Sequence, residues 1–231
     1  MKNYFLIFIL FNSIPAAGQN TPLIHDESYL DKTFWEFKVK LEHAIINRDL
    51  SQLKPLIADK VFLSRDLCPN DGCTKTTFLR EIENTGDYYW QILEKNTRFG
   101  FTYSDPDLAI LPTSYTDKVF VSPSYIDNIN IDLETLILGR NVNIRDKPTL
   151  NSNVIRQASY EKFKCDCNIA DQTETTYQQA DGLLWLEIKL KNGSFGYVAA
   201  KFTSSNNHDV LIVGKVNGVW KIISLFSPSG C

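Results

Sequence analysis

The sequence has few of the residues and motifs on which metal-dependent, nucleotide-dependent and nucleophilic enzymes rely. It contains three histidines, and none of His25, His43 and His208 stands at a zinc-site spacing from a cysteine. No Gly-x-Ser-x-Gly elbow, P-loop or dinucleotide-binding fingerprint occurs in the chain. We therefore expect no catalytic residues, no metal and no cofactor.

An excess of positive charge and long apolar segments are also absent. The formal net charge is −3, which gives no electrostatic reason to expect nucleic acid or an anionic membrane surface as a partner. No segment after the first residues is apolar enough to span a bilayer. These absences favour a soluble mature protein with no membrane span.

The N-terminus has the pattern of a secretory signal peptide. Lys2 gives it a short basic start, Tyr4 to Phe11 is an unbroken apolar run, and Ala16-Ala17-Gly18 offers small residues for cleavage. A run this short cannot span a bilayer, which needs about 20 residues. We expect residues 1–18 to be a signal peptide and the mature protein to be exported to a periplasmic or extracellular location.

Export changes the interpretation of the five cysteines, because oxidising compartments favour disulfides. The segment from Cys68 to Cys73 contains Pro69, Asn70, Asp71 and Gly72, so it predicts a turn closed by a disulfide between its ends. Cys165 and Cys167 are not expected to pair with each other, since side chains two apart on a strand project in parallel. One of them could reach Cys231, and this pairing stays open.

Before residue 130 the pattern predicts helices and a few strands. Apolar residues at steps of three and four predict a helix over 27–48, and Asp49 is a suitable N-cap for a second, short helix. Thr74 begins another helix, which Gly86 interrupts, and a further helical turn or two is expected around Tyr88 to Leu93. Strands are expected at Val61 to Leu63 and Val119 to Val121, and the stretch between Phe99 and Ser114 is expected to be loop.

The C-terminus predicts a hairpin around Asn217-Gly218, the strongest short signal for a tight turn. Strands from Val210 and from Trp220 to Phe226 need partners, because an isolated hairpin is marginal in water. We therefore expect an α+β fold in which residues 23–130 and 206–231 form one domain. The order of long helix, short helix, strand, helix and terminal Asn-Gly-x-Trp-Lys-Ile hairpin resembles the nuclear-transport-factor-2-like group of cone-shaped folds.

The segment between these two halves carries a second pattern. Val142-Asn143-Ile144-Arg145-Asp146-Lys147-Pro148 alternates as a half-buried strand does and ends at a proline. Trp185, the run Glu187 to Leu190, the Asn192-Gly193 turn and Gly196-Tyr197-Val198 follow in order. Residues 139–202 thus resemble a bacterial SH3 domain, a small five-stranded barrel. The resemblance implies an all-β barrel over residues 138–203, inserted into the α+β domain, and binding of peptidoglycan or another envelope ligand.

The segment from Ala158 to Leu184 is longer than in that family and could reshape or cover its groove. Rigid aromatic surfaces bind sugars and peptides at low entropic cost, and the aromatic residues of this region are Tyr160, Phe163, Tyr177, Trp185, Phe195 and Tyr197. Our candidate ligand-binding residues are Tyr160, Tyr177, Trp185, Tyr197 and Arg145. The alternatives are that Trp185, Phe195 and Tyr197 fill the barrel and that Arg145 is simply solvated.

These patterns predict an exported, non-catalytic SH3-domain-containing protein that binds a cell-envelope ligand such as peptidoglycan or a peptide. One alternative is a structural or interaction protein whose barrel is only a packed spacer. A second alternative is an enzyme with a pocket in the α+β domain, in which His43 would serve as acid or base. The sequence does not identify the ligand or the oligomeric state.

Overall fold

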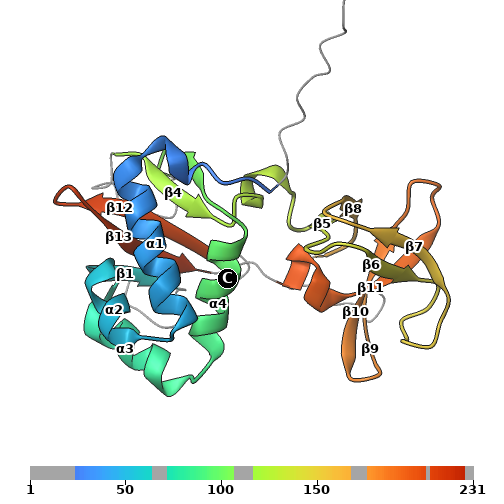
Figure 1. The fold of residues 1–231 in the computed structure, drawn as a ribbon. Helices are drawn as coiled ribbons and strands as arrows, with labels where there is room; N and C mark the ends of the chain where they lie inside the picture. Colours follow the sequence, from blue (N-terminus) through green and yellow to red (C-terminus); the bar gives the residue numbers. More distant parts are fainter. Residues whose placement is uncertain (1–23, 64–71, 107–116, 168–175, 207–208, 227–231) are drawn as a thin grey trace, which may run out of the picture.

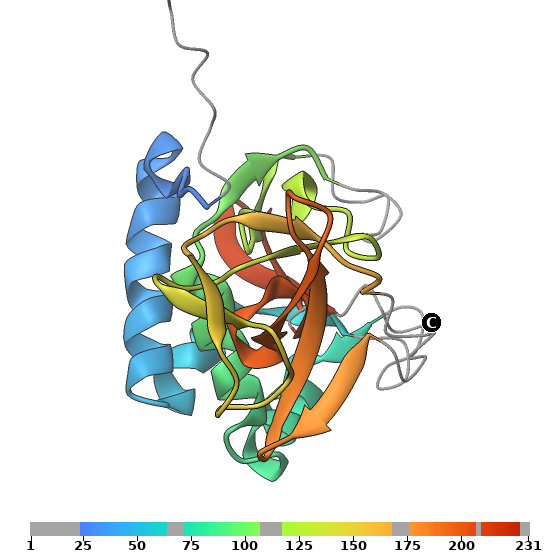
Figure 2. The same cartoon turned by 90° about the vertical axis from the view of Figure 1, so that its right-hand side faces the viewer.

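The computed structural model describes residues 24–63, 72–106, 117–167, 176–206 and 209–226, and they form two lobes of an α+β protein (Figure 1). Helices and one sheet make the first lobe. A second, curled sheet makes the other, which faces the viewer in Figure 2. The expected signal peptide, residues 1–18, and the cleavage point after Gly18 lie outside the described residues.

The longest helix, α1 (Lys32–Ile46), forms because its apolar residues fall on one face and its N-terminus is capped. Phe34, Phe37 and Leu41 lie on the buried face. The Asp31 carboxylate accepts hydrogen bonds from the backbone N–H groups of Thr33 and Phe34, which satisfies two of the helix's free donors. The helix begins later than the expected residue 27, since a short 3₁₀ turn, η1 (Ser28–Leu30), precedes it.

The other helices of the first lobe follow their capping signals. Asp49 caps α2 (Leu50–Leu53), which continues into η2 (Lys54–Leu56). Thr74 caps α3 (Lys75–Asn84), and the final helix is α4 (Tyr88–Arg98). The helix from Tyr88 is longer than the one or two turns that the sequence predicts.

The first sheet has the strand order β2-β1-β13-β12-β4-β3, and the C-terminal hairpin lies at its centre. Its turn at Asn217 and Gly218 has positive φ at both residues, as expected. On one side β13 pairs in parallel with β1, and on the other β12 pairs with β4. The strands are β1 (Ile57–Leu63), β2 (Cys73–Thr74), β3 (Thr102–Ser104), β4 (Val119–Ser122), β12 (Val210–Val216) and β13 (Val219–Phe226).

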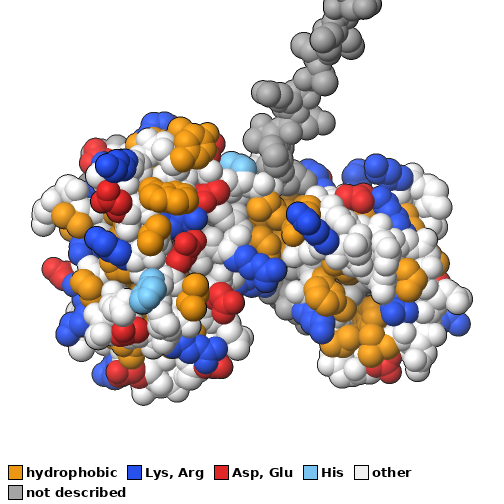
Figure 3. Space-filling model, viewed as in Figure 1, with side chains coloured by type: hydrophobic (Ala, Val, Ile, Leu, Met, Phe, Trp, Pro, Cys, Tyr) orange, Lys and Arg blue, Asp and Glu red, His pale blue; other side chains and the backbone are white. Residues whose placement is uncertain are grey.

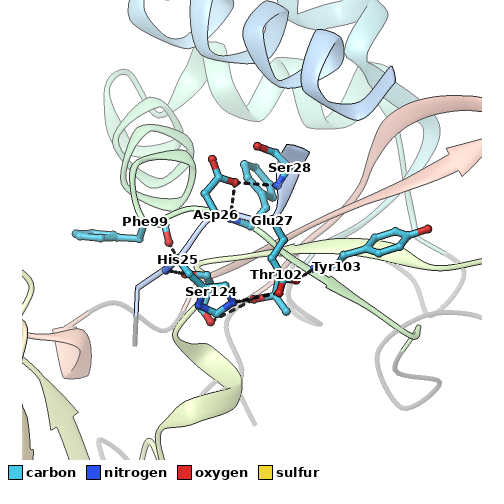
Figure 4. Close-up of polar contacts among 9 residues, drawn as sticks. His25, Asp26, Glu27, Ser28, Phe99, Thr102, Tyr103 and Ser124 are labelled. Atoms are coloured by element: carbon cyan, nitrogen blue, oxygen red, sulfur yellow. Dashed lines mark hydrogen bonds and ion pairs between the residues drawn. The ribbon is translucent and has the colours of Figure 1, made fainter. Parts of the chain in front are cut away.

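The expectation of loop between Phe99 and Ser114 is wrong for β3, which lies inside that stretch. The strand has three residues, too few to show a period of two. It pairs with β4 at the edge of the sheet, and its residues also bond to the segment before α1 (Figure 4). The Glu27 backbone N–H donates to the Phe101 carbonyl, and the Tyr103 N–H donates to the Glu27 carboxylate.

The second sheet has the order β5-β8-β10-β11-β6-β7, with β9 added beside β10. Two of its strands, β8 and β9, lie within the segment 158–184, and β5 lies before residue 138, where the barrel was expected to begin. The strands are β5 (Glu134–Leu136), β6 (Val142–Arg145), β7 (Val154–Ala158), β8 (Lys162–Lys164), β9 (Tyr177–Ala180), β10 (Leu183–Lys189) and β11 (Phe195–Ala199).

The chain enters and leaves the second lobe at one place. Ile137 forms an isolated bridge with Thr203, and the Leu138 N–H donates to the Phe202 carbonyl. Short 3₁₀ turns follow β4 and β11, namely η3 (Ile126–Asn128), η5 (Ala200–Phe202) and η6 (Ser204–Asn206). Beside this crossing the two lobes share a buried cluster of Phe99, Tyr125, Leu136 and Leu138.

The return segment from Ser204 is polar in sequence, yet its serines are buried. Ser204 and Ser205 are each about 1 % exposed. Both hydroxyls lie within hydrogen-bond distance of the Thr135 hydroxyl, and the Ser204 hydroxyl accepts the Leu136 N–H. Small hydroxyl side chains satisfy one another here, so burial does not cost them their hydrogen bonds.

Candidate functional site

The outward side of the second sheet carries two lysines directly opposite each other. Lys164 on β8 and Lys189 on β10 are register partners, and Lys189 is in turn the partner of Phe195 on β11. Directly paired residues share a face and have Cβ atoms about 4.5–5.5 Å apart. Both lysines are exposed, and Phe195 is 55 % exposed. The row therefore presents two cations beside an exposed aromatic ring.

A second row on the same face lies two residues away along the strands. It consists of Glu187 on β10, Tyr197 on β11 and Arg145 on β6. The Tyr197 hydroxyl donates to the Glu187 carboxylate at 2.6 Å. This bond, together with partial burial, raises the pKa of Tyr197. We call the two rows together the outer face; it is formed by Lys164, Lys189, Phe195, Glu187, Tyr197 and Arg145.

Arg145 is less available to a ligand than Tyr197. Its guanidinium donates to the Ser152 carbonyl at 2.5 Å, which holds it toward the turn between β6 and β7. The side chain is half-buried. Arg145 therefore supports the local turn. The other cations of the outer face are Lys189 and Lys164, and Lys164 also lies opposite Glu134 of β5, whose pKa it helps to lower.

A cavity of about 280 Å³ opens beside these rows. Two cations, Lys164 and Lys189, and two anions, Asp166 and Glu187, line it together with Phe195, and Cys165 and Thr176 complete the lining. None of the ion pairs found among the described residues includes Lys164 or Lys189. Like charges directly opposite on a sheet are destabilising. Glu134, the partner of Lys164 on β5, compensates part of this repulsion, and an anion placed between the two lysines would relieve the rest.

Next to the cavity, Cys165 and Cys167 form a disulfide with each other. The expectation that they would not pair is wrong, because β8 ends at Lys164 and the rule of parallel side chains applies only within a strand. The Cys165 and Cys167 N–H groups donate to the carbonyls of Leu133 and Asp132. Cys73 is also disulfide-bonded, but Cys68 lies outside the described residues, as does Cys231.

Trp185, a predicted ligand-binding residue, is only 2 % exposed. It lies on the strand face of Glu187 and Lys189, but its indole N–H donates to the Ala180 carbonyl at 3.1 Å. A covered ring whose donor is satisfied belongs to the core, so Trp185 is excluded from a surface site. Phe195, weighed as a core residue, is instead exposed.

The two remaining tyrosines differ from each other. Tyr160 is 41 % exposed, but it lies in the turn after β7 and does not line the cavity. Tyr177 is half-buried, and this burial raises its pKa. It packs against the buried core of the second lobe, and only Tyr197 of the four predicted aromatic residues belongs to the outer face.

The histidine nominated for catalysis does not line a described cavity. His43 is exposed on α1, and its Nδ1 lies 2.8 Å from the Gln52 amide oxygen. A cavity of about 360 Å³ elsewhere in the first lobe contains Lys38, but this lysine is bound by Asp26 at 2.9 Å and Glu42 at 3.1 Å. These charges satisfy one another and hold the segment before α1 in place.

Sequence reasoning missed Lys164, Lys189, Asp166 and Glu187 as site residues. Lys189 was visible as part of the alternating run Glu187 to Leu190, whose polar positions share one face. The pairing of Lys189 with Lys164 across about 25 residues of sequence could not be read from any local pattern. No sequence signal indicated Lys164 as the partner, because β8 has three residues and is too short to show the alternation of a strand.

Among the described residues no cluster of three or more histidine, cysteine, aspartate or glutamate side chains is arranged to hold a metal ion. No helix in this part of the chain combines the length and apolarity required to cross a membrane. Comparisons with protein-family models, curated proteins and solved structures found no match to this chain.

Proposed function

We propose that the protein is an exported, non-catalytic binding protein whose second lobe is an SH3-like barrel that binds a carboxylate-bearing peptide of the cell envelope, such as the peptide of peptidoglycan. The observation that carries this proposal is the pair Lys164 and Lys189 beside the exposed ring of Phe195. Exposed like charges in direct register are unfavourable in isolation and favourable around an anion.

The composition of the cavity favours a peptide with both charges over a neutral sugar. A peptide carboxylate would lie between the two lysines, and a peptide amine would face Asp166 and Glu187. The ring of Phe195 would cover the apolar part of the peptide at a low cost in side-chain entropy. A neutral sugar could stack on the ring and form hydrogen bonds with the charged groups, but it would bring no opposite charge to them.

The fold agrees with this proposal in two respects. The predicted opening strand, Val142–Arg145, pairs with β7 and β11, and the closing hairpin consists of β10 and β11. The disulfide between Cys165 and Cys167 fits an oxidising compartment. Export itself rests on the N-terminal pattern of residues 1–18.

Retention on purified, insoluble peptidoglycan tests the proposal. The mature protein should sediment with the polymer, and Lys164→Gln combined with Lys189→Gln should reduce retention about tenfold, as should Phe195→Ala. The matched control is Lys147→Gln, which removes an exposed lysine of the same lobe outside the cavity. Circular dichroism establishes that each variant is folded.

Two results would contradict the proposal. One is absence of retention, which would favour a structural role for the second lobe; the cluster of Phe99, Tyr125, Leu136 and Leu138 that joins the lobes supports this alternative. The other is equal loss in Lys147→Gln, which would indicate nonspecific attraction between a cationic surface and an anionic polymer. Determination of the N-terminal residue of the secreted protein tests export separately.

A further inference from the structure

The first lobe contains a second pocket, which lies between α1 and the end of the C-terminal hairpin. Its volume is about 500 Å³, within the usual range for small-molecule sites. It lies in the other lobe from the outer face, and the inference drawn from it does not depend on the function proposed for that face. We call it the helix–hairpin pocket; it is lined by Thr33, Glu36, Phe37, Lys40, Pro55, Leu56, Gly218, Val219, Trp220 and Lys221.

The apolar part of this pocket is held rigidly. Trp220 is 4 % exposed, and its indole N–H donates to the Thr33 hydroxyl at 2.9 Å. The Lys215 ammonium lies 4.6 Å from the centre of the Trp220 ring and is paired with Asp31. The Thr33 hydroxyl in turn donates a hydrogen bond to the Asp31 carboxylate at the start of α1. An anchored ring of this kind forms a preorganised apolar surface, which lowers the entropic cost of binding.

The remaining apolar walls come from different elements. Phe37 of α1 and Leu56 of η2 are nearly buried, while Val219, at the start of β13, is 55 % exposed. Figure 3 shows further hydrophobic side chains reaching the surface over α1. The pocket thus has an apolar floor that is open to solvent at the hairpin end.

Three charged side chains line the pocket, and their net charge is positive. Lys40 and Lys221 are cationic and Glu36 is anionic. None of the ion pairs found in the described part of the chain includes any of the three. The Lys221 ammonium donates to the Pro55 carbonyl, which fixes its position, and its charge also lowers the pKa of the Asp59 carboxyl. An ammonium has three donors, so others remain for a ligand.

We propose that the helix–hairpin pocket binds a small organic acid, with the apolar body of the ligand on Phe37, Leu56 and Trp220 and the acidic group at Lys40 and Lys221. Apolar enclosure with a few polar groups at one end is the usual design of small-molecule sites. The excess of cations selects an acid over an amine. A cavity of about 500 Å³ is in the range of small-molecule sites, so we commit to a small molecule as the ligand.

Decanoate is a suitable probe, since it joins an apolar chain to one carboxylate. Isothermal titration calorimetry on the intact mature protein should show saturable binding of decanoate, and binding of decanol and decyltrimethylammonium should be at least about tenfold weaker. Lys40→Gln combined with Lys221→Gln should weaken decanoate about tenfold and leave decanol unchanged. The matched control, Lys54→Gln, removes an exposed neighbouring lysine that does not line the pocket.

A second variant tests occupancy of the apolar floor. Val219→Trp places a large side chain at an exposed position of the pocket and should block decanoate without unfolding the lobe. Equal affinity for decanoate and decanol, or full decanoate binding by Val219→Trp, would overturn the proposal. So would retention on phosphatidylglycerol vesicles through Lys40 and Lys221 without binding of decanoate, which would assign the lysines to a lipid surface.

Discussion

Trp185 and Phe195 lie on the same side of the second sheet but differ in exposure, at 2 % and 55 %. We expect Trp185→Ala to lower the free energy of unfolding by about 3–5 kcal/mol, because it removes a buried aromatic side chain and leaves a cavity. Phe195→Ala should change this free energy by about 0.5 kcal/mol or less, since an exposed residue outside the core rarely contributes more. Urea denaturation followed by circular dichroism measures both, and equal destabilisation would contradict the assignment of Phe195 to the surface.

Asp31 makes a pH-dependent contribution to stability. Partial burial raises its pKa, but hydrogen bonds from Thr33, Lys215 and the backbone of α1 outweigh this and lower the pKa from 3.8 to about 2. A carboxyl group whose pKa is lower in the folded protein stabilises it above the unfolded pKa, and this stabilisation is lost as the pH falls through the folded pKa. Screening by solvent reduces the charge contribution at this partly exposed site.

We therefore expect Asp31→Ala to cost about 1–2 kcal/mol at neutral pH, mostly through loss of the helix cap. The difference from wild type should shrink between about pH 4 and about pH 2, where Asp31 becomes protonated. Urea titrations at several pH values measure the difference. A difference that stays constant down to pH 2 would show that the negative charge of Asp31 makes no contribution.

At the level of single residues, the sequence predicted alternation better than exposure. Glu187 and Lys189 were visible as the polar side of a strand, and Ile188 as the buried side. Trp185 shares the outer side with them, and strand alternation gives no information on which part of that side is covered. Exposure there depends on hydrogen bonding to Ala180 and on neighbouring turns, which are set by tertiary structure.

At the level of secondary-structure elements, the segment before α1 packs closely against the backbone at Gly100. This glycine has φ of +73°, and a Cβ at its position would overlap the carbonyl oxygen of His25. Gly100→Ala combines backbone strain of about 1–3 kcal/mol with displacement of that segment. Figure 4 shows the contacts of His25 and Glu27 that would be lost.

We expect Gly100→Ala to lower the melting temperature substantially and to increase protease cleavage near His25. Gly218→Ala is the matched control, because Gly218 also has positive φ but a Cβ there would meet no atom within 4 Å. Gly218→Ala should lower the melting temperature only through backbone strain, without displacing any neighbouring segment. Equal effects of the two variants on cleavage near His25 would contradict the role of Gly100 in seating this segment.

The disulfide between Cys165 and Cys167 leads to a prediction for the oxidised protein. Cleavage after lysine and arginine places both cysteines in one peptide, from Cys165 to Lys189. Without reduction, mass spectrometry should find this peptide free of any crosslink to another peptide. Its mass should be lower than that of its reduced form by two hydrogen atoms, because of the internal disulfide. A crosslink from either cysteine to a peptide containing Cys231 would contradict this pairing.

The sequence identified long periodic elements and missed short ones. Helix α1 has a strong period of three to four residues, and the hairpin at Asn217-Gly218 has its own turn chemistry. The strands β3, β5 and β8 have three residues each and are defined by their partners in space. The outer face was therefore predicted only in part, because one of its two lysines comes from such a strand.

At the level of the whole molecule, the first sheet is completed by strands from the far end of the chain. β12 and β13 are its two central strands, and they pair with β4 and β1. Removal of residues 209–231 should therefore abolish cooperative folding of the first lobe, because it leaves the β1–β2 and β3–β4 pairs without the strands between them. Loss of the cooperative urea transition measures this, and a retained transition would contradict the arrangement.

Removal of the middle of the second lobe should have the opposite result. Its ends meet where Ile137 pairs with Thr203 and Leu138 bonds to Phe202, so an Asn-Gly turn can replace residues 139–201. The cluster of Phe99, Tyr125, Leu136 and Leu138 is retained. The deletion would expose the side chain of Ile137 to solvent, so Ile137→Thr replaces it with a polar one. We expect this shortened chain to keep the helical circular dichroism signal, one cooperative urea transition and decanoate binding, while peptidoglycan retention is lost. A chain with helical signal but no cooperative transition would show that the first lobe depends on the second for its packing.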